Sequence, residues 1–359
     1  MNRKPLLKNK ILGIIGGGQL GRMTALAAAK FGIECHIFDP DLNAPAFQVC
    51  SKTYINDYED LNAIKEFANG IDAALYEFEN IPLKSAQIIE ELCLLRPSSF
   101  VLSVSQDRLI EKKFLLDKAK VQTAKFYECN SYEDLVNAKN LIKGSSVLKT
   151  RRFGYDGKGQ IKINYDTDLL EAWKSIGSNK LILEEFVPFK RELSIIIARD
   201  HNNNVQVYDT VENKHKNHIL DQTIAPAPGI SDKIAQSAKK IAINIANELD
   251  LIGILAIELF ELNNGDLIVN EIAPRPHNSG HWTMDGCVTD QFEQAVRAAV
   301  GINLGSTERL FDIVMQNLIG KDIYIADNLM NDPNCRVHRY GKKEVRPGRK
   351  MGHINHLIR

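Results

Sequence analysis

The amino-acid sequence predicts a mixed fold, in which an α/β unit with a parallel sheet is followed by two α+β parts. Three observations lead to this expectation. Apolar runs typical of strands alternate with helical segments up to about residue 106, as in a parallel sheet with helical crossovers. A basic, glycine-rich loop follows between two further predicted strands, at 151–160. Later, Asn264 and Gly265 separate two apolar stretches, which is a strong signal for an antiparallel hairpin.

The predicted elements follow one another in three groups. Residues up to about 106 contain strands at 11–15, 34–39 and 73–79, a helix that begins in the first glycine loop and stops at Gly32, and a helix around 59–68. The next group contains a helix at 107–118 capped by Asp107, strands at 146–149, 161–163 and 181–186, and helices at 131–140 and 166–175. The last group contains paired strands within 193–209, a helix at 231–250, the hairpin at 254–271, and a helix at 290–300 that stops at Gly301.

The length and charge of the chain limit its possible functions. Its 359 residues correspond to two or three domains. Lys and Arg number 45, and so do Asp and Glu, so no broad basic face for nucleic acid is expected. The six cysteines form no CxxC pair, the N-terminal apolar run is too short for a secretion signal, and no stretch is apolar enough to span a membrane. We therefore expect a cytoplasmic protein whose ligands are small anions.

The first glycine loop, GGGQLG at 16–21, stands between a strand and a helix. Gly16, Gly18 and Gly21 match the GxGxxG pattern, and Asp39 ends the next strand, which is the arrangement of dinucleotide-binding folds. The alternative is that these glycines only permit a tight turn, whose helix N-terminus would still bind a phosphate. An NAD-dependent oxidoreductase is therefore the first rival hypothesis.

The second glycine loop, RRFGYDGKGQ at 151–160, carries more basic residues than a solvated turn needs. Glycines allow backbone N–H groups to close around phosphate oxygens, while Lys149 and Lys158 add positive charge. We expect this loop to cover the phosphates of a nucleotide, with a plain turn as the alternative. Downstream, the strand end EEFV at 184–187 could supply backbone groups for an adenine edge, and Glu192 a carboxylate for ribose hydroxyls, unless both are ordinary surface features.

The hairpin brings two glutamates together. A two-residue turn at Asn264-Gly265 pairs Glu258 with Glu271, with their Cβ atoms about 5 Å apart on one face. Their repulsion can be relieved by a shared proton, by a nearby arginine such as Arg275, or by a divalent cation. Because the chain also has a phosphate loop, magnesium is the favoured interpretation. On this view, Glu271→Gln would abolish turnover and relieve repulsion in the fold.

The loop after the hairpin, APRPHNSGHW, contains two histidines four residues apart, at 277 and 281. That spacing would suit zinc on a helix, but Pro274, Pro276 and Gly280 oppose a helix here. We therefore interpret this segment as a loop for an anion and a substrate. Its donors beside the carboxylate pair are Arg275, His277 and Asn278.

Five stretches together resemble the ATP-grasp superfamily and, within it, the N5-carboxyaminoimidazole ribonucleotide synthetase family. They are GGGQLGRM, QDRLIEKK, GYDGKGQ, NEIAPRPHNSGHW and EVRPGRKMGH, and the resemblance covers nearly the whole chain. It implies a three-part ATP-grasp fold. The parts are a Rossmann-like domain at 1–106, a lid with its entry helix at 107–186, and a catalytic part at 187–305, which is followed by a short C-terminal segment at 306–359.

The resemblance also implies residue roles. The implied ATP contacts are Arg108, Lys149, Gly154, Tyr155, Asp156, Gly157, Lys158, Gly159, Gln160, Glu184, Glu185, Phe186, Val187, Glu192, His215, Asn270 and Glu271. The implied magnesium ligands are Glu258 and Glu271, and the implied catalytic residues are Arg275, His277 and Asn278. The implied substrate contacts are Gly18, Gln19, Leu20, Gly21, Glu77, Tyr155, Asp156, His277, Arg349 and Lys350. Many ATP-grasp enzymes have Asn where this chain has Ala273, so water would fill more of the coordination positions of the metal here.

The implied reaction converts ATP, bicarbonate and 5-aminoimidazole ribonucleotide into ADP, phosphate and the N5-carboxylated ribonucleotide, through carboxyphosphate. A homodimer and a lid that closes over nucleotide are expected as well. We further expect Arg349 or Lys350 to fold back onto the first domain and bind the substrate phosphate with Gly18–Gly21. The second rival hypothesis is a non-catalytic nucleotide-binding regulator, against which the intact carboxylate pair argues.

Overall fold

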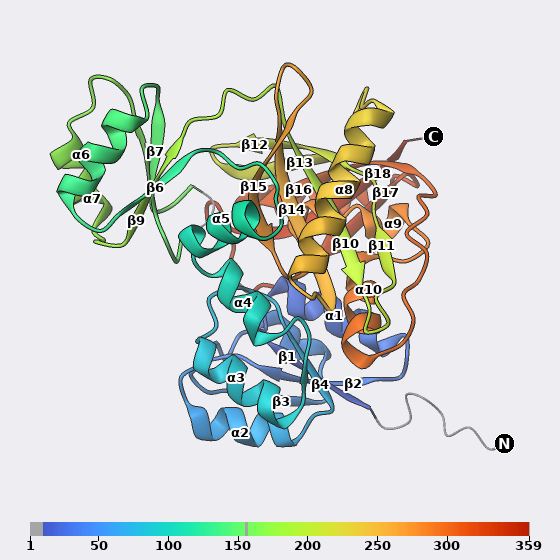
Figure 1. Ribbon diagram of the computed structural model, residues 1–359. Helices are drawn as coiled ribbons and strands as arrows, with labels where there is room; N and C mark the ends of the chain where they lie inside the picture. The colour runs from blue at the N-terminus through green and yellow to red at the C-terminus, as the bar shows by residue number, and fades with distance from the viewer. Residues whose placement is uncertain (1–9, 155–156, 359) are drawn as a thin grey trace.

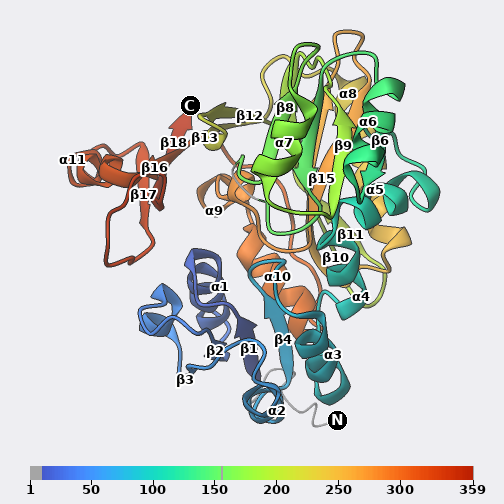
Figure 2. The same cartoon turned by 90° about the vertical axis from the view of Figure 1, so that its left-hand side faces the viewer.

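The computed structural model describes residues 10–154 and 157–358. Within them the chain forms three sheets (Figures 1 and 2). The N-terminal sheet has five strands, the lid sheet four and the central sheet nine. In Figure 1 the lid stands out at the upper left, the N-terminal part lies below, and the central sheet occupies the upper right. In the described residues, no helix is both long and apolar enough to cross a membrane.

The N-terminal sheet is parallel throughout, as the sequence predicts. Its order is β3-β2-β1-β4-β5, from β1 (Ile11–Ile15), β2 (Glu34–Phe38), β3 (Lys52–Tyr54), β4 (Ala73–Tyr76) and β5 (Leu94–Leu95). Its helical segments are α1 (Gln19–Ala29), η1 (Pro45–Val49), α2 (Leu61–Asn69), α3 (Leu83–Leu92) and α4 (Ser99–Ser105). Strands β3 and β5 were not predicted, because two or three residues are too few to show the alternation of apolar and polar residues typical of a strand.

The lid is an antiparallel sheet with its own hydrophobic core. Its strands are β6 (Phe126–Cys129), β7 (Ser146–Thr150), β8 (Gln160–Ile163) and β9 (Leu181–Glu185), and its helices are α6 (Tyr132–Leu141) and α7 (Leu169–Ile176). Only β6 was not predicted. Helix α5 (Arg108–Asp117) leads into the lid, and the Asp107 carboxylate caps it by accepting from the N–H groups of Leu109 and Ile110.

The central sheet has the order β15-β14-β10-β12-β13-β16-β18-β17, with β11 paired to β10. Its strands are β10 (Arg191–Arg199), β11 (Val205–Val207), β12 (Val211–Lys216), β13 (Ile219–Ala225), β14 (Gly253–Glu261), β15 (Leu267–Ala273), β16 (Asp312–Ile319), β17 (Cys335–Arg339) and β18 (Lys350–Ile358). The C-terminal residues, which the sequence suggested were a basic tail, therefore continue this sheet. In Figure 1, β17 and β18 lie at the right, on the opposite side of the view from the lid.

The helices of the central part hold this sheet against its neighbours. They are α8 (Asp232–Glu248), η2 (Asn278–Gly280), α9 (Thr283–Gly286), α10 (Gln291–Val300), η3 (Gly320–Ile325) and α11 (Ala326–Leu329). On α8, Ala238, Ala242 and Ala246 recur every fourth residue, so the helix can approach the sheet closely. Helix α10 packs on α1, and a single core extends from Met23 to Phe292. The first glycine loop thus lies on the same rigid body as the hairpin.

The hairpin has the predicted pairing of Glu258 with Glu271, but the loop between its strands is not the predicted two-residue turn. The connection is a three-residue loop: Leu262 N–H donates to Asp266 O at 2.9 Å, and Gly265 has a φ of +85°. Next to this loop the strands pair one residue away from the register that a two-residue turn would give, so that Leu259 pairs with Val269 instead of Asn270. A bulge at Asn270, between the pairs of Leu259 and Glu258, then restores the expected register. The extra residue in the loop and the extra residue in the bulge thus offset each other.

Candidate active site

Glu258 and Glu271 face each other on neighbouring strands, and an arginine from another element relieves their repulsion. Nη1 of Arg108, at the start of α5, lies 2.7 Å from Oε2 of Glu271. Burial opposes ionisation of Glu271, but the charge and hydrogen bond of Arg108 hold its pKa below the usual value. Burial and the neighbouring Glu271 raise the pKa of Glu258 to about 7.

Arg275 does not fill the role of counter-charge that the sequence suggested for it. Its Nε lies 2.7 Å from Oε1 of Glu79, beyond the end of β4. The correction has a geometric reason. Arg275 follows the end of β15, and its N–H bonds back to Ala273 O in a tight turn, whereas α5 presents Arg108 directly to the paired strands.

The carboxylate pair fits magnesium in its chemistry. Both donors are hard oxygen ligands, and a cation between them would favour the ionised form of Glu258, whose pKa burial and Glu271 raise. In the described residues, no three His, Cys, Asp or Glu side chains are grouped so that they could hold a metal. A magnesium ion here would take its other ligands from phosphate and water.

A second cationic cluster lies next to this pair. Nζ of Lys149 is 2.9 Å from Oε2 of Glu184, and Nζ of Lys112 is 3.5 Å from the same oxygen. Burial opposes the charge on Glu184, but Lys112, Lys149 and Arg108 lower its pKa to about 2. Lys112 Nζ also donates to Asn270 O at 2.7 Å. Glu184 and Asn270, both expected to contact ATP, are thus joined by one buried lysine.

Sequence reasoning missed Lys112, although its side chain is only 1% exposed. The signal was available, since Lys112 follows Arg108 by four residues and lies on the same face of α5. Glu111 is a second missed residue. It is buried, and burial followed by the charge of Glu271 raises its pKa well above the usual value.

The second glycine loop lies over the carboxylate pair. Nη2 of Arg108 donates to Gly154 O at 3.5 Å while Nη1 bonds Glu271, so this side chain connects the loop with β15. Gly157 has a φ of +77° and Gly159 a φ of +69°, which explains why glycines stand there. Tyr155 and Asp156 lie outside the described residues. The expected phosphate contacts Lys158, which is exposed, and Gln160, which begins β8, stay predictions.

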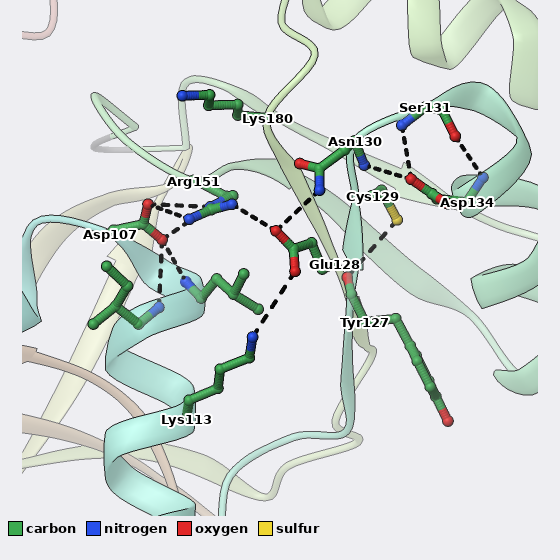
Figure 3. A network of polar contacts seen from close by, with 12 residues as sticks. Asp107, Lys113, Tyr127, Glu128, Cys129, Asn130, Ser131, Asp134, Arg151 and Lys180 are labelled. Carbon is green, nitrogen blue, oxygen red and sulfur yellow. Dashed lines mark hydrogen bonds and ion pairs between the residues drawn. The ribbon is translucent and has the colours of Figure 1, made fainter.

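A network of ion pairs fixes the base of this loop to the entry helix (Figure 3). Arg151 donates through Nε and Nη2 to the carboxylate of Asp107, at 2.8 to 3.1 Å, and through Nη1 to Glu128 Oε1 at 2.8 Å. Glu128, on β6, also lies 3.8 Å from Nζ of Lys113 on α5. Backbone N–H of Arg108 donates to Arg151 O at 2.9 Å. The lid and Arg108 are therefore connected directly.

A cavity of about 500 Å³ opens where β9 leaves the lid and passes the hairpin loop. Three of the four residues of the EEFV strand end contribute to it. Six of its eleven lining residues are apolar, and the full set is Thr123, Ala124, Lys125, Glu185, Phe186, Val187, Pro188, Leu262, Asn263, Asn264 and Ile268. A mostly apolar cavity beside a strand end suits a flat heterocycle such as adenine.

Glu192 and His215 lie together, with Nδ1 of the histidine 3.0 Å from a carboxylate oxygen. Burial opposes the charge on His215, but the hydrogen bond and charge of Glu192 raise its pKa above the usual value. A partly charged His215 could attract phosphate, as expected, while Glu192 is shared between the histidine and any ribose.

The loop after β15 forms no α-helix until Thr283, which confirms the prediction that the histidine spacing is not a zinc-binding helix. His281 is buried, with Nδ1 3.0 Å from Nε2 of Gln291. His277 instead points to the carboxylate pair, with Nε2 3.3 Å from Oε1 of Glu258. Both amide atoms of Asn278 are buried and have no partner among the described residues, so they are available to a ligand.

The first glycine loop differs from its predicted role. The N–H of Gly21 donates to Glu77 Oε2 at 2.6 Å, and the N–H of Gly18 donates to the other oxygen of Glu77. The N–H of Gly17 donates to Asp39 at 2.6 Å. The anion at this helix N-terminus is thus a side chain of the protein, whose pKa burial raises. A substrate phosphate on these amides would have to displace Glu77.

Two neighbours of these glycines have separate positions. Gln19 begins α1, while the Leu20 side chain is packed in the hydrophobic core. The side chain of Leu20 is therefore not free to reach a ligand, and the substrate contact expected at this position stays a prediction.

The C-terminal basic segment contacts the first domain through Gly341 and Lys343, while the contact expected of Arg349 or Lys350 with the first glycine loop stays a prediction. Gln48 Nε2 donates to Gly341 O at 2.9 Å, and Lys343 Nζ donates to Asn43 Oδ1 at 2.5 Å. Burial, followed by the charge of Arg349, lowers the pKa of Lys342 to about 8, with Glu77 opposing. Lys342 was not predicted, although it belongs to the same basic segment as Arg349.

The start of β18 places Lys350 beside Lys342 and near the carboxylate pair. Nζ of Lys342 donates to Lys350 O at 2.8 Å, where β18 begins. The charge of Lys350 helps to lower the pKa of His277, after burial and Arg275. Glu77, His277 and these cations therefore surround one region between the first domain and the central sheet.

Comparisons with known proteins agree with this arrangement. The chain matches family models described as a ribonucleotide synthetase preATP-grasp domain at residues 9–106, an ATP-grasp domain at 114–292 and a phosphoribosylaminoimidazole carboxylase C-terminal domain at 313–358. It is 43% identical to the N5-carboxyaminoimidazole ribonucleotide synthase of Brucella melitensis, over 99% of both chains. It is 38% identical to that of Bacillus subtilis, over 99% of this chain and 94% of the relative.

Solved structures show the same likeness. The synthetase from Thermus thermophilus superposes with a TM-score of 0.90 at 40% identity, covering 97% of this chain and 93% of the other. A synthase from Aspergillus clavatus in complex with ADP and 5-aminoimidazole ribonucleotide has a TM-score of 0.90 at 28% identity, covering 98% and 94%.

The three-part fold and the carboxylate pair beneath a glycine loop define an ATP-grasp ligase. The chain belongs to the N5-carboxyaminoimidazole ribonucleotide synthase family of purine biosynthesis. The oxidoreductase hypothesis is therefore wrong, and the amides that would have bound a dinucleotide pyrophosphate are bonded to Glu77.

Proposed function

We propose that this chain carboxylates 5-aminoimidazole ribonucleotide with bicarbonate, in a reaction that converts ATP to ADP and phosphate through carboxyphosphate. The observation that carries the proposal is the position of Arg108, which bonds Gly154 O in the phosphate loop and Glu271 in the carboxylate pair. One guanidinium thus reaches both the covering loop and the expected metal ligands.

ATP would lie with its adenine in the cavity at the end of β9 and its phosphates beneath the loop at 154–160. Lys149 and Arg108 would face the phosphates, with Lys112 holding Glu184 in place behind them. These cations are positioned before nucleotide arrives, so they stabilise the charge on the transferring phosphoryl group without reorganisation.

Glu258 and Glu271 would hold magnesium, which when bound neutralises the β- and γ-phosphates and orients them for attack. Bicarbonate would attack the γ-phosphorus from the side of Arg275, His277 and Asn278. Asn278 suits this role because its buried amide has no partner among the described residues. Its N–H groups could orient a planar oxyanion.

The ribonucleotide would bind between the first domain and the C-terminal strands. Lys342, Arg349 and Lys350 provide the positive charge for its phosphate, while Glu77 on the opposite side could orient its amine. The amine would then capture carboxyphosphate, or the CO2 that it releases, in a site from which the lid excludes water. The homodimer and the cytoplasmic location stay predictions.

The test is the release of ADP by the purified chain with magnesium and ATP, measured with and without each of the two other substrates. We expect full turnover only when 5-aminoimidazole ribonucleotide and bicarbonate are both present. The absence of ADP release under every condition would favour the regulator hypothesis. Turnover with the ribonucleotide that does not respond to bicarbonate in CO2-depleted buffer would contradict the proposed carboxylation.

A further inference from the structure

The imidazole of His277 is held at both of its ring nitrogens. Nδ1 lies 2.8 Å from Oγ of Ser279 and accepts from the backbone N–H of Ser279 at 3.3 Å. Nε2 lies 3.3 Å from Oε1 of Glu258. The backbone of His277 is fixed as well, because its N–H and C=O both bond the side-chain amide of Gln291 at 2.8 Å.

The backbone of Ser279 decides which ring nitrogen of His277 carries the hydrogen. A backbone N–H can only donate, so Nδ1 must present a lone pair to Ser279. An imidazole with a lone pair at Nδ1 is neutral and carries its hydrogen at Nε2, which is the nitrogen 3.3 Å from Oε1 of Glu258.

A chain of buried hydroxyl and amide groups supports this choice from behind. Thr223 Oγ1 donates to Asn213 Oδ1 at 2.9 Å, Asn213 Nδ2 donates to Ser194 Oγ at 2.9 Å, and Ser194 Oγ donates to Ser279 Oγ at 2.8 Å. Ser194, Ser279 and Thr223 are fully buried, so water does not compete with these bonds.

The chain has a direction. The amide group of Asn213 can only donate, so it leaves the hydrogen of Ser194 free to point at Ser279. The oxygen of Ser279 then accepts that hydrogen and donates its own to Nδ1 of His277. Every member of the chain therefore directs a donor toward the ring.

We propose that Ser279 and the residues behind it are positioning residues that fix His277 in the Nε2–H tautomer. His277 then serves as a permanent hydrogen-bond donor to Glu258, and it cannot act as a base toward that side. With the opposite tautomer, the Nε2 lone pair would repel the carboxylate and turn it away from Glu271. The inference depends on the proposed function only in treating Glu258 as part of the reaction site.

The tautomer can be measured without any reaction. Protein labelled with ¹⁵N histidine, free of nucleotide and metal at pH 8, should show for His277 a non-protonated Nδ1 and a protonated Nε2 in long-range ¹H–¹⁵N spectra. The resonances are assigned by their loss in His277→Gln. A protonated Nδ1 in the wild-type protein would overturn the proposal, whatever the variants do.

Two variants distinguish an effect on the tautomer of His277 from an effect on the stability of the fold. Ser279→Ala removes the hydroxyl donor and leaves only the longer backbone contact, so its Nδ1 resonance should shift toward the value of a mixed population. Thr283→Val is the matched control. It removes another fully buried hydroxyl of the same segment, which donates to Gly280 O at 2.6 Å, accepts from the backbone N–H of Gln291 at 3.0 Å and does not contact His277. The control should lower the melting temperature and leave the His277 spectrum unchanged.

Turnover provides the second readout. Ser279→Ala should lower kcat about tenfold, the size of loss typical when the support of a site residue is removed, with little change in KM for ATP. An unchanged tautomer in a folded Ser279→Ala protein would show that the hydroxyl chain does not set it. If wild-type protein shows the predicted tautomer but never turns over, the proposed function fails and the tautomer assignment stands.

Discussion

The guanidinium of Arg108 lies 2.7 Å from a carboxylate oxygen of Glu271, although the two residues are 163 positions apart in the chain. Arg108 begins the helix that enters the lid, and Glu271 lies on the hairpin of the central sheet. A change in the lid therefore reaches the carboxylate pair through one side chain. Mutations on either side of this contact should separate binding from chemistry.

Replacing Arg108 should damage catalysis more than stability. Arg108→Met removes a cation that contacts both Glu271 and the phosphate loop, and we expect kcat/KM for ATP to fall about 100-fold or more. Steady-state ADP release measures this. The control is Arg309→Met, which removes a half-buried arginine that pairs with Asp209 and Asp312. Its activity should stay near wild type, and equal losses in both variants would contradict the assignment.

The two opposed glutamates should respond differently to neutralisation. Between pH 4.5 and about 7, folded protein keeps a proton on Glu258 that the unfolded chain has lost, because burial and Glu271 raise its pKa to about 7. The contribution of this group to the free energy of unfolding therefore falls as the pH rises through that window. Glu258→Gln should stabilise ligand-free protein at pH 8 by about 1–3 kcal/mol and change little at pH 5.

Thermal melts at the two pH values check this prediction, with Glu248→Gln as a control that removes an exposed carboxylate of α8. Glu271→Gln should act in the opposite direction. The sequence suggested that it would relieve repulsion, but the structure pairs Glu271 with Arg108, so the variant leaves that arginine without its partner. Both glutamine variants should lose turnover. A stabilised Glu271→Gln protein would show that the Arg108 contact is weak.

How far the sequence predicts this site can be seen in the same two glutamates. Alternation and the Asn-Gly signal locate the hairpin, yet the pairing of Glu258 and Glu271 comes out right only because the bulge at Asn270 offsets the longer loop. Bulges depend on tertiary contacts, here the bond from Lys112 to Asn270 O, which no local pattern reveals. The motifs locate the reacting groups, and the contacts between distant segments decide which charges they meet.

The same limit applies to the first glycine loop and to the C-terminal strands. The GxGxxG pattern predicts an anion at a helix N-terminus, and an anion is present, but it is Glu77, 56 residues beyond Gly21. Strands β16 to β18 were missed because their residues mix polar and apolar types, with Asn317, His353 and Asn355 fully buried. Each of these side chains has a partner from a distant segment, since Asn317 donates to Leu220 O, His353 bonds Tyr340 and Asn355 donates to Asp285. The sequence alone does not show these contacts.

The lid should loosen when its anchor to the entry helix is removed. Asp107 both caps α5 and accepts the Nε and Nη2 bonds of Arg151 (Figure 3), so Asp107→Asn weakens two functions at once. We expect KM for ATP to rise about tenfold and kcat to fall less. Glu128→Gln, which weakens the outer contact of Arg151 and the longer contact with Lys113, should raise KM by no more than a few-fold.

Limited proteolysis adds a readout of lid closure for these variants. The glycine loop of the wild-type protein should be protected when magnesium and ATP are added, and Asp107→Asn should need more nucleotide for the same protection. Equal cleavage with and without nucleotide in the wild type would contradict a closing lid. A KM that Glu128→Gln raises as much as Asp107→Asn does would contradict the role of the cap.

The last prediction concerns the cations that the C-terminal segment brings to the first domain. Burial and Arg349 lower the pKa of Lys342 to about 8, so free protein holds this side chain charged below pH 8 and progressively neutral above it. A phosphate monoester needs that charge. KM for 5-aminoimidazole ribonucleotide should therefore rise between pH 8 and 9, while KM for ATP stays nearly constant. Lys342→Met should raise the ribonucleotide KM at least tenfold at pH 7.5 and remove this pH dependence, and Lys350→Ala should raise it as well.

Lys343→Ala is the matched control, because its ammonium group bonds Asn43 on the surface. If the KM for ATP moves instead, or if all three lysine variants behave alike, these cations do not form the phosphate site of the ribonucleotide.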